Sequence, residues 1–464
     1  MKKSYEMDMC SGPLLSKILI FSIPLMISGI LQLLFNAADI VVVGRFTGSE
    51  AMAAVGSTSA LINLIINLFV GISVGANVVV ARNYGARDYD GVHGAVHTSV
   101  LTALIGGVFL IFVGIALARP LLELMGTPDN VIDQSVLYMR IYFVGMPSFM
   151  LYNFGSAILR AIGDTKRPLY FLILAGVINV FLNLFFVIVF HMGVAGVALA
   201  TIISQTVSAI LVLLCLMKME GPCHLDFKHL KFHLNQLGQM LRIGLPAGLQ
   251  GIVFSLSNVL IQSSVNSFGS IAMAGNTASA NIEGFVYPAM NAVYQTNLSF
   301  TSQNLGAGKP ERIKPVYRDC ILTVLLIGVP MCALLSFFGQ PLLGIYIAKD
   351  DPAYASVIAS GMVRVTYMGM TYFVCGIMET CCGMVRGLGR SWMPMVVTIF
   401  GACVLRIIWI YTIFQTHHTL DVLYLSYPVS WVVTSAVHVL CFVLIYRRMM
   451  ARWNTHKEEE NASY

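Results

Sequence analysis

The sequence predicts an all-α polytopic membrane protein with about 12 transmembrane helices, arranged as two pseudo-symmetric lobes of about six helices each. Hydrophobic residues make up 57% of the 464-residue chain and charged residues only 11%, which is too little polar surface to cover a soluble globule. Apolar stretches of about 20 residues or more recur along the chain, each long enough to cross about 30 Å of hydrocarbon. These stretches are continuous and lack the alternation of barrel strands, so we expect helices.

Polar connections separate the expected spans. The first apolar stretch is too long and too polar for the core of a cleavable signal, so we expect it to remain as the first span. The spans are expected near residues 15–43, 51–79, 94–118, 131–158, 169–190, 194–217, 238–266, 272–303, 316–338, 354–384, 394–415 and 422–447. The longest polar interruption falls at the midpoint of the chain. We therefore predict an N-terminal lobe, a cytoplasmic linker, a C-terminal lobe and a cytoplasmic tail, at residues 1–217, 218–237, 238–447 and 448–464.

The two halves of the chain carry matching segments. AILRAIGDTKRP at 157–168 matches GMVRGLGRSWMP at 383–394, the turn RNYGA returns as QNLGA, and Pro24 aligns with Pro246. Lobes repeated in the same orientation are related by an axis along the membrane normal, and transporters built this way move one lobe against the other around a site near the midplane. The repeat therefore predicts a transporter that works by alternating access.

Lys and Arg gather in alternate connections between the spans. The net charge of +6 therefore follows the positive-inside rule and does not mark a nucleic-acid surface. This distribution places both termini in the cytoplasm and the chain in the cell membrane. The ten cysteines form no zinc-finger spacing, so we expect reduced thiols and no metal apart from Na+. For His224, His229 and His233 in the linker, a solvated loop is the simpler interpretation and a metal site the alternative.

A polar face runs along the first span. Ser28, Gln32, Asn36 and Asp39 are spaced four, four and three residues apart, which puts them on one side of a helix. An ionised acid at the middle of a span costs roughly 2.5–3.5 kcal/mol on insertion scales. The functional interpretation is that Asp39 binds a coupling cation or a proton, and the structural alternative is that it only bonds neighbouring helices.

Neutral polar residues in other spans of the N-terminal half are candidates to complete this site. Asn179 and Asn183 lie four residues apart in the fifth span, and Thr201 follows in the sixth. With Asp39 they supply one carboxylate and three neutral oxygens, which suits a hard monovalent cation, while the lone acid could take a proton instead. The alternative is that the asparagines join helices. In the second span, Asn63 belongs to a polar stripe that lines a cavity or bonds a neighbouring helix.

The C-terminal half contains two acids deep within spans. Glu283 and Tyr287 follow helical spacing in the eighth span, and Glu379 lies in the tenth. These residues are candidates for ion coupling or for attracting a positively charged substrate. The alternative for the acids, and for Glu379 above all, is a buried ion pair with Arg406.

The candidate cation site is not duplicated in the repeat. Ile261 stands at the position that matches Asp39, and the segment VLR that ends at Arg406 matches the region of Asn179. The lobes are therefore expected to share a fold and to differ in chemistry.

These features together resemble the multidrug and toxic compound extrusion (MATE) family along essentially the full length of the chain. The resemblance rests on the helix with Pro24 and Asp39, the duplicated NxGA turns, the paired LRAxGD and VRGLGR turns and the twelve-helix plan. It implies a secondary antiporter that exports cationic or amphiphilic drugs and toxins in exchange for inward Na+ or H+.

The same resemblance implies that Asp39, Asn179 and Thr201 form the cation site of the N-terminal lobe. Some members have a second Asp where this chain has Asn183, which leaves the choice of ion open. We expect no cofactor besides the coupling ion, a monomer, and partners limited to the lipid bilayer and small molecules. The alternative function is a flippase for lipid-linked or polyprenyl precursors, which usually needs a cationic cavity. An intramembrane hydrolase is disfavoured because the chain has no HExxH motif.

Overall fold

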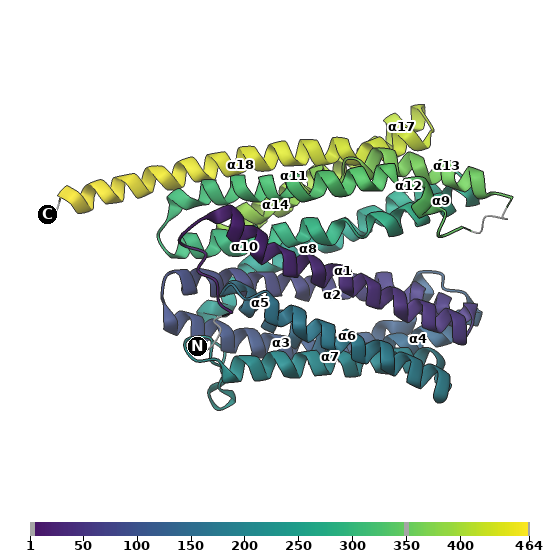
Figure 1. Cartoon of the computed structure of the whole chain (residues 1–464), viewed down its shortest axis with the longest axis horizontal. Coiled ribbons are helices and arrows are strands. Elements are labelled where there is room, and N and C mark those ends of the chain that lie inside the picture. Colours follow the sequence, from purple (N-terminus) through teal and green to yellow (C-terminus); the bar gives the residue numbers. More distant parts are fainter. Residues whose placement is uncertain (1–4, 348–351, 463–464) are drawn as a thin grey trace. The chain divides into compact units, whose positions relative to one another are not determined.

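A computed structural model of the chain describes residues 5–347 and 352–462, and within them every regular element is helical (Figure 1). The first half contains α1 (Leu14–Phe46), α2 (Ser49–Gly85), α3 (Tyr89–Leu124), α4 (Asp129–Val144), α5 (Met146–Ala161), α6 (Lys166–Leu184), the π-helical turn η1 (Phe185–Val189) and α7 (Gly193–Lys218). The linker contains one 3-10 turn, η2 (Phe227–His229).

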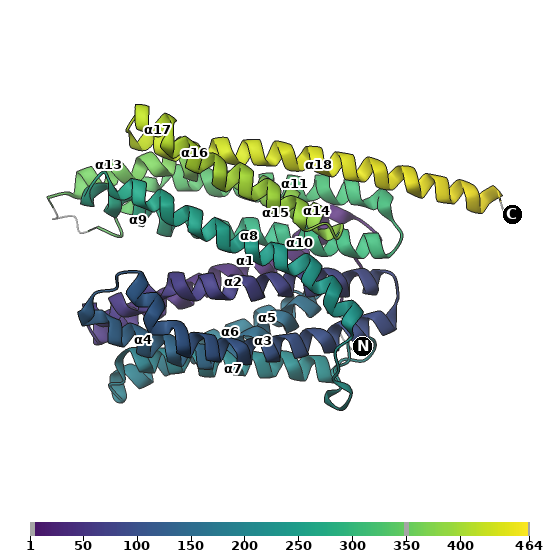
Figure 2. The same cartoon turned by 180° about the vertical axis from the view of Figure 1, so that it is seen from behind.

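The second half follows the same plan with more interruptions (Figure 2). It contains α8 (Leu234–Asn266), α9 (Ser270–Glu283), α10 (Tyr287–Gly306), η3 (Pro310–Arg312), α11 (Ile313–Phe337), α12 (Gly339–Leu343), α13 (Tyr354–Arg364), η4 (Val365–Gly369), α14 (Tyr372–Gly387), α15 (Trp392–Thr398), η5 (Ile399–Val404), α16 (Leu405–Tyr411), α17 (Ile413–Thr416) and α18 (Leu420–Ala462). The turns η4 and η5 are π-helical and lie inside the tenth and eleventh predicted spans.

The prediction of an all-α membrane protein is confirmed. In the described part of the chain, 10 helices are long and apolar enough to cross a bilayer. The two predicted spans missing from this count, 131–158 and 272–303, are each divided into two helices. A proline follows each break, Pro147 in the first turn of α5 and Pro288 in the first turn of α10. Proline fits there because the first turn of a helix leaves its backbone N–H groups without intrahelical partners.

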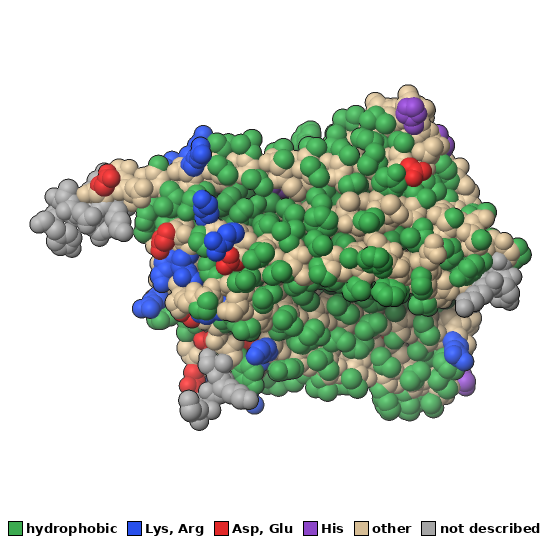
Figure 3. Space-filling model, turned by 45° about the horizontal axis from the view of Figure 1, so that its top comes forward, with side chains coloured by type: hydrophobic (Ala, Val, Ile, Leu, Met, Phe, Trp, Pro, Cys, Tyr) green, Lys and Arg blue, Asp and Glu red, His purple; other side chains and the backbone are tan. Residues whose placement is uncertain are grey.

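Side-chain exposure on the helices is consistent with contact with lipid. Phe112 and Phe181 in the first half, and Phe400 in the second, are each more than half exposed although they lie within long apolar helices. On the face drawn in Figure 3, hydrophobic side chains cover the broad middle, and Lys and Arg side chains gather toward one end. An apolar middle with charge at its end is the surface that a bilayer requires.

Packing divides the chain into two compact units. The first contains Ile27–Gly251 and the N-terminal segment up to Asp8, and the second contains Met9–Met26 and the chain from Ile252 onward. Both α1 and α8 therefore give one part of their length to each unit. This division follows packing, whereas the predicted lobes follow the sequence repeat and stay a prediction.

Small residues let α2 and the first half of α8 approach closely within the first unit. A Cβ atom on Gly75 would lie 2.2 Å from the carbonyl oxygen of Met240, and one on Gly71 would lie 2.2 Å from the backbone nitrogen of Gly248. Each helix carries a GxxxG spacing at this crossing, which is the pattern that brings backbones together in membranes.

The N-terminal segment is anchored within the second unit. Ser22 and Thr296 share a hydrogen bond of 2.7 Å between their hydroxyl groups, and the rings of Phe21 and Phe300 meet edge to face at 5.6 Å. The amide of Asn304 donates to the carbonyl of Met9 at 3.1 Å. The half of α1 that precedes the candidate site is therefore fixed to α10.

Candidate cation and substrate site

Asp39 lies on α1, one turn beyond Asn36, and is buried with 7% of its surface exposed. Its partner comes from α6: the side-chain amide of Asn183 donates a hydrogen bond to Oδ1 of Asp39. The same amide group also donates to Oδ1 of Asn179 at 3.2 Å. The predicted pairing of the first and fifth spans is therefore present in the structure.

The hydrogen bonds continue from α6 to α7. The amide of Asn179 donates to Oγ1 of Thr201 at 3.4 Å, and that hydroxyl donates to the carbonyl of Val197 at 2.9 Å. Asn183 is fully buried, and its Oδ1 atom has no hydrogen-bond partner among the described residues. The carboxylate thus sits at one end of a chain of neutral polar groups that joins three helices.

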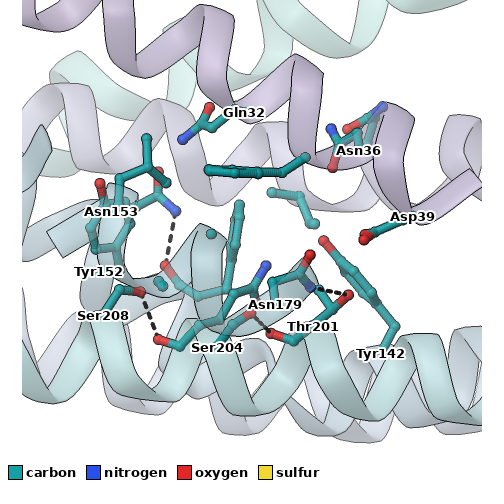
Figure 4. A pocket seen from close by; sticks show the side chains of 18 residues that line it. Gln32, Asn36, Asp39, Tyr142, Tyr152, Asn153, Asn179, Thr201, Ser204 and Ser208 are labelled. Carbon is teal, nitrogen blue, oxygen red and sulfur yellow. Dashed lines mark hydrogen bonds between the residues drawn. The ribbon is translucent and has the colours of Figure 1, made fainter. Parts of the chain in front are cut away.

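A cavity of about 280 Å³ opens beside this chain of hydrogen bonds, with walls from α1, α2, α4, α5, α6 and α7 (Figure 4). Its lining includes six residues singled out in the sequence, namely Gln32, Asn36, Asp39, Asn63, Asn179 and Thr201. Asn183 lies behind them and reaches Asp39 through its amide. Among the lining residues Asp39 is the only charged one, so the cavity has a single acid in a neutral polar and aromatic wall.

Several polar lining residues were not predicted: Tyr142, Tyr152, Asn153, Ser204, Gln205 and Ser208. Ser204, Gln205 and Ser208 continue the face of Thr201 at intervals of three, four and seven residues, so helical spacing could have identified them. Tyr142 and Tyr152 gave no such signal, because they lie on either side of the break between α4 and α5.

Glu283 of the second unit forms an ion pair, with Arg364 and not with the Arg406 of the alternative interpretation. Nη2 of Arg364 lies 2.9 Å from Oε2 of Glu283, whose side chain is 2% exposed. Nη1 of the same arginine donates to Oδ1 of Asn276 at 2.6 Å, and the hydroxyl of Tyr424 donates to that oxygen at 2.9 Å. Glu283 is therefore neutralised by Arg364 and not by Arg406.

Glu379 and Tyr287 belong to the second unit and are not among the residues that line the cavity beside Asp39. Glu379 is half-buried on α14, and Tyr287 is 43% exposed at the first position of α10. The alternative interpretation of Glu379, an ion pair with Arg406, is wrong, because that pair is absent from the ion pairs of the described residues.

One histidine of the linker lies close to an aspartate. The ring of His229 approaches Oδ2 of Asp226 at 2.6 Å. The backbone N–H of Lys228 and then the His229 ring hold the pKa of Asp226 below its usual range. Within residues 5–347 and 352–462, no group of three or more His, Cys, Asp or Glu side chains is arranged to hold a metal ion.

Known proteins share both the sequence and the fold. The probable multidrug resistance protein YoeA of Bacillus subtilis is 31% identical over 389 residues, which is 82% of this chain and 83% of that protein. An FAD transporter of Shewanella oneidensis is 26% identical over 74% of this chain and 76% of its own length. The structure of a multidrug resistance MATE family transporter in its outward-facing conformation superposes with a TM-score of 0.88, at 23% identity, over 98% of this chain and 100% of the other.

A family model agrees with the internal repeat. The model described as MatE matches residues 24–185 and again residues 246–412, so each half of the chain accounts for one copy. The two matches begin at Pro24 and at Pro246, which the repeat aligns. Together with the shared fold and the multidrug resistance relatives, these matches show that the chain is a member of the MATE family of membrane transporters.

Proposed function

We propose that the chain is a secondary active antiporter that exports cationic or amphiphilic drugs and toxins in exchange for inward Na+ or H+. The setting of Asp39 carries this function: it is a buried carboxylate on a membrane-length helix, in the wall of a cavity whose other polar groups are neutral. Acids inside spans are costly and mark ion and substrate pathways. The multidrug resistance relatives support the same class of cargo.

A single carboxylate provides a simple basis for exchange. An incoming Na+ or H+ and a departing cationic substrate compete for the same negative charge, so the binding of one favours the release of the other. In an exchange of one Na+ or H+ for one singly charged cargo, the charges that enter and leave cancel, so the concentration gradient of the ion drives export. The membrane potential adds about 2.3 kcal/mol per 100 mV only for each net positive charge that enters, as with a neutral cargo.

The residues around Asp39 support both ions. Sodium needs several oxygen ligands, which Asp39, Asn179 and Thr201 supply. Asn183 turns its NH₂ group toward the carboxylate, and its buried Oδ1 has no partner among the described residues. Reversing this amide would offer a further oxygen to Na+, whereas a proton on Asp39 requires no reversal.

Alternating access between the lobes at residues 1–217 and 238–447 completes the cycle. Pro24 and Pro246 lie shortly before the points at which α1 and α8 pass from one compact unit to the other, and proline inside a helix permits a bend. We further propose a monomer in the cell membrane with both termini in the cytoplasm, as the distribution of Lys and Arg predicts.

A flippase for lipid-linked precursors is the weaker candidate. Such a substrate carries phosphate groups, which call for Lys or Arg in the binding cavity. Among the described residues, the lining of the cavity beside Asp39 contains one acid and no Lys or Arg. This charge balance favours a positively charged substrate.

The decisive experiment measures efflux of a cationic dye such as ethidium from proteoliposomes or everted vesicles. Sodium and pH gradients are imposed separately, each with and without a membrane potential. We expect dye movement only when one of the two ions flows in the opposite direction. Dye transport that continues at the same rate without either gradient would contradict antiport.

A further inference from the structure

Arg406 is a buried cation with no acid paired to it in the described part of the chain. It lies in the first turn of α16, directly after the π-helical turn η5, and its surface is 0% exposed. Its Nε atom donates to Oγ of Ser430 at 2.8 Å. Nη1 and Nη2 have no hydrogen-bond partner among the described residues, and none of the ion pairs found there includes Arg406.

Aromatic rings surround the guanidinium group. Its central carbon lies 4.1 Å from the ring centroid of Tyr427, 5.7 Å from that of Phe254 and 5.8 Å from that of Trp431. Contact with ring faces stabilises the positive charge, but it provides no hydrogen-bond acceptor for the N–H groups, which point outward in the guanidinium plane. The indole Nε1 of Trp431 is also buried without a partner in the described part of the chain. Two neighbouring side chains thus carry three buried nitrogen donors that have no acceptor among the described residues.

This place corresponds to the site of Asp39 in the other half of the repeat. Ile261 stands where the first half has Asp39, and it packs in the same apolar cluster as Tyr427 and Trp431. The segment that ends at Arg406 matches the region of Asn179. The first unit thus presents a carboxylate and amide oxygens, whereas the second presents N–H donors and a positive charge.

We propose that Arg406 and Trp431 bind a monovalent anion in the second unit, either a free halide such as chloride or the carboxylate of a zwitterionic cargo. The two free Nη atoms of an arginine match the two oxygens of a carboxylate, and a single halide can also accept from both. A buried guanidinium without a counter-charge is costly inside a membrane protein, so an anion that accepts these donors is strongly favoured.

Tryptophan fluorescence tests this site on the purified full-length protein. Iodide, a halide that quenches indole, is titrated at constant ionic strength with sulfate as the balancing anion. The chain contains four tryptophans. The quenching that belongs to Trp431 is therefore the difference in iodide quenching between the original protein and the Trp431→Phe variant. We expect that part of the quenching to saturate with iodide, because binding beside Trp431 is specific. Quenching that rises linearly, or that Trp431→Phe leaves unchanged, would overturn the site.

Variants of the arginine separate binding from packing. In Arg406→Gln the saturable quenching should disappear, whereas it should persist in Arg390→Gln, which removes an exposed arginine. Arg406→Lys keeps a positive charge against the aromatic rings but loses the fork of donors, so iodide affinity should fall about tenfold, as expected for one lost charged hydrogen bond. If Arg406→Gln is not monodisperse, Arg406→Lys decides, and unchanged affinity there would refute the assignment.

The source of the anion is distinguished by competition. A rhodamine dye with a free carboxylate is compared with its methyl ester as a competitor of iodide. Competition by the free acid alone indicates a cargo carboxylate, and competition by neither indicates an inorganic halide; both results support the anion site. The variant Asp39→Asn should bind iodide as the original protein does, so a failure of the proposed antiport and a failure of this site give different results.

Discussion

The amide of Asn183 on α6 donates a hydrogen bond to the carboxylate of Asp39 on α1, and both side chains are buried. No Lys or Arg of the described chain lines the cavity beside them. The situation of Glu283 is the opposite, because Arg364 already neutralises it at 2.9 Å. Of these two acids, only Asp39 has a charge that an ion or a cationic substrate can neutralise. We therefore expect coupling to depend on Asp39 more than on Glu283.

Asp39→Asn should abolish gradient-driven efflux while leaving expression intact. The amide keeps the size of the side chain and removes the negative charge for which ion and substrate compete. Dye efflux from proteoliposomes should fall to the level of liposomes without protein. Asp133→Asn is the matched control, since it makes the same change in a side chain that is 79% exposed, and it should transport normally. A fully active Asp39→Asn protein would exclude Asp39 as the coupling residue.

Asn183→Asp should strengthen cation binding at the same site. A second carboxylate next to Asp39 adds attraction for Na+ and adds repulsion between the two acids when no cation is bound. The Na+ concentration for half-maximal efflux should fall roughly tenfold, which corresponds to about 1.4 kcal/mol.

Thermal stability provides the second measurement for this variant. Asn183→Asp should unfold at a lower temperature without Na+ and should recover when Na+ is added, whereas Asn183→Leu, which loses one potential oxygen ligand, should respond to Na+ less than the original protein does. An equal response of the original protein and both variants would indicate that Na+ does not bind beside Asp39.

The residues of the candidate site could be predicted because they share helix faces. Asn36 and Asp39 lie three residues apart, and Asn179 and Asn183 lie four apart. This spacing places each pair on one face of its helix, whichever helix packs against that face. The meeting of these faces was inferred from the resemblance, and the hydrogen bond from Asn183 to Asp39 agrees with it.

Pairings between distant helices were harder to predict. Glu283 was expected to face Arg406 if it formed an ion pair, but its partner is Arg364, 81 residues along the chain. Which residues of two helices meet depends on their rotation and crossing, which helical spacing alone does not determine. The divisions between α4 and α5 and between α9 and α10 escaped prediction for another reason. Apolar sequence continues through the first break, so hydropathy gives no boundary there. The second break falls at Glu283 and Gly284, which were interpreted as part of one span.

Breaking the ion pair in the second unit should destabilise the protein without removing coupling. Arg364→Met leaves the charge of Glu283 buried and unpaired, which costs about 3–5 kcal/mol. The double variant Glu283→Gln with Arg364→Met should recover most of that loss, because both charges are then gone. Thermal unfolding of the detergent-solubilised protein measures the effect. If the stability losses of the two single variants simply add in the double variant, the ion pair does not contribute to stability. Loss of efflux in a folded Glu283→Gln protein would contradict the assignment of ion coupling to Asp39.

The close crossing of α2 and α8 gives a prediction that does not depend on the transported ion. In Gly75→Ala the new Cβ atom would stand 2.2 Å from the carbonyl oxygen of Met240, so the two backbones must move apart. Overpacking of this kind costs about 1–3 kcal/mol. Gly56→Ala is the matched control in the same helix, since its Cβ would meet nothing within 4 Å. Gly75→Ala should therefore lower the unfolding temperature and Gly56→Ala should not, and equal unfolding temperatures would mean that the helices do not meet at this crossing.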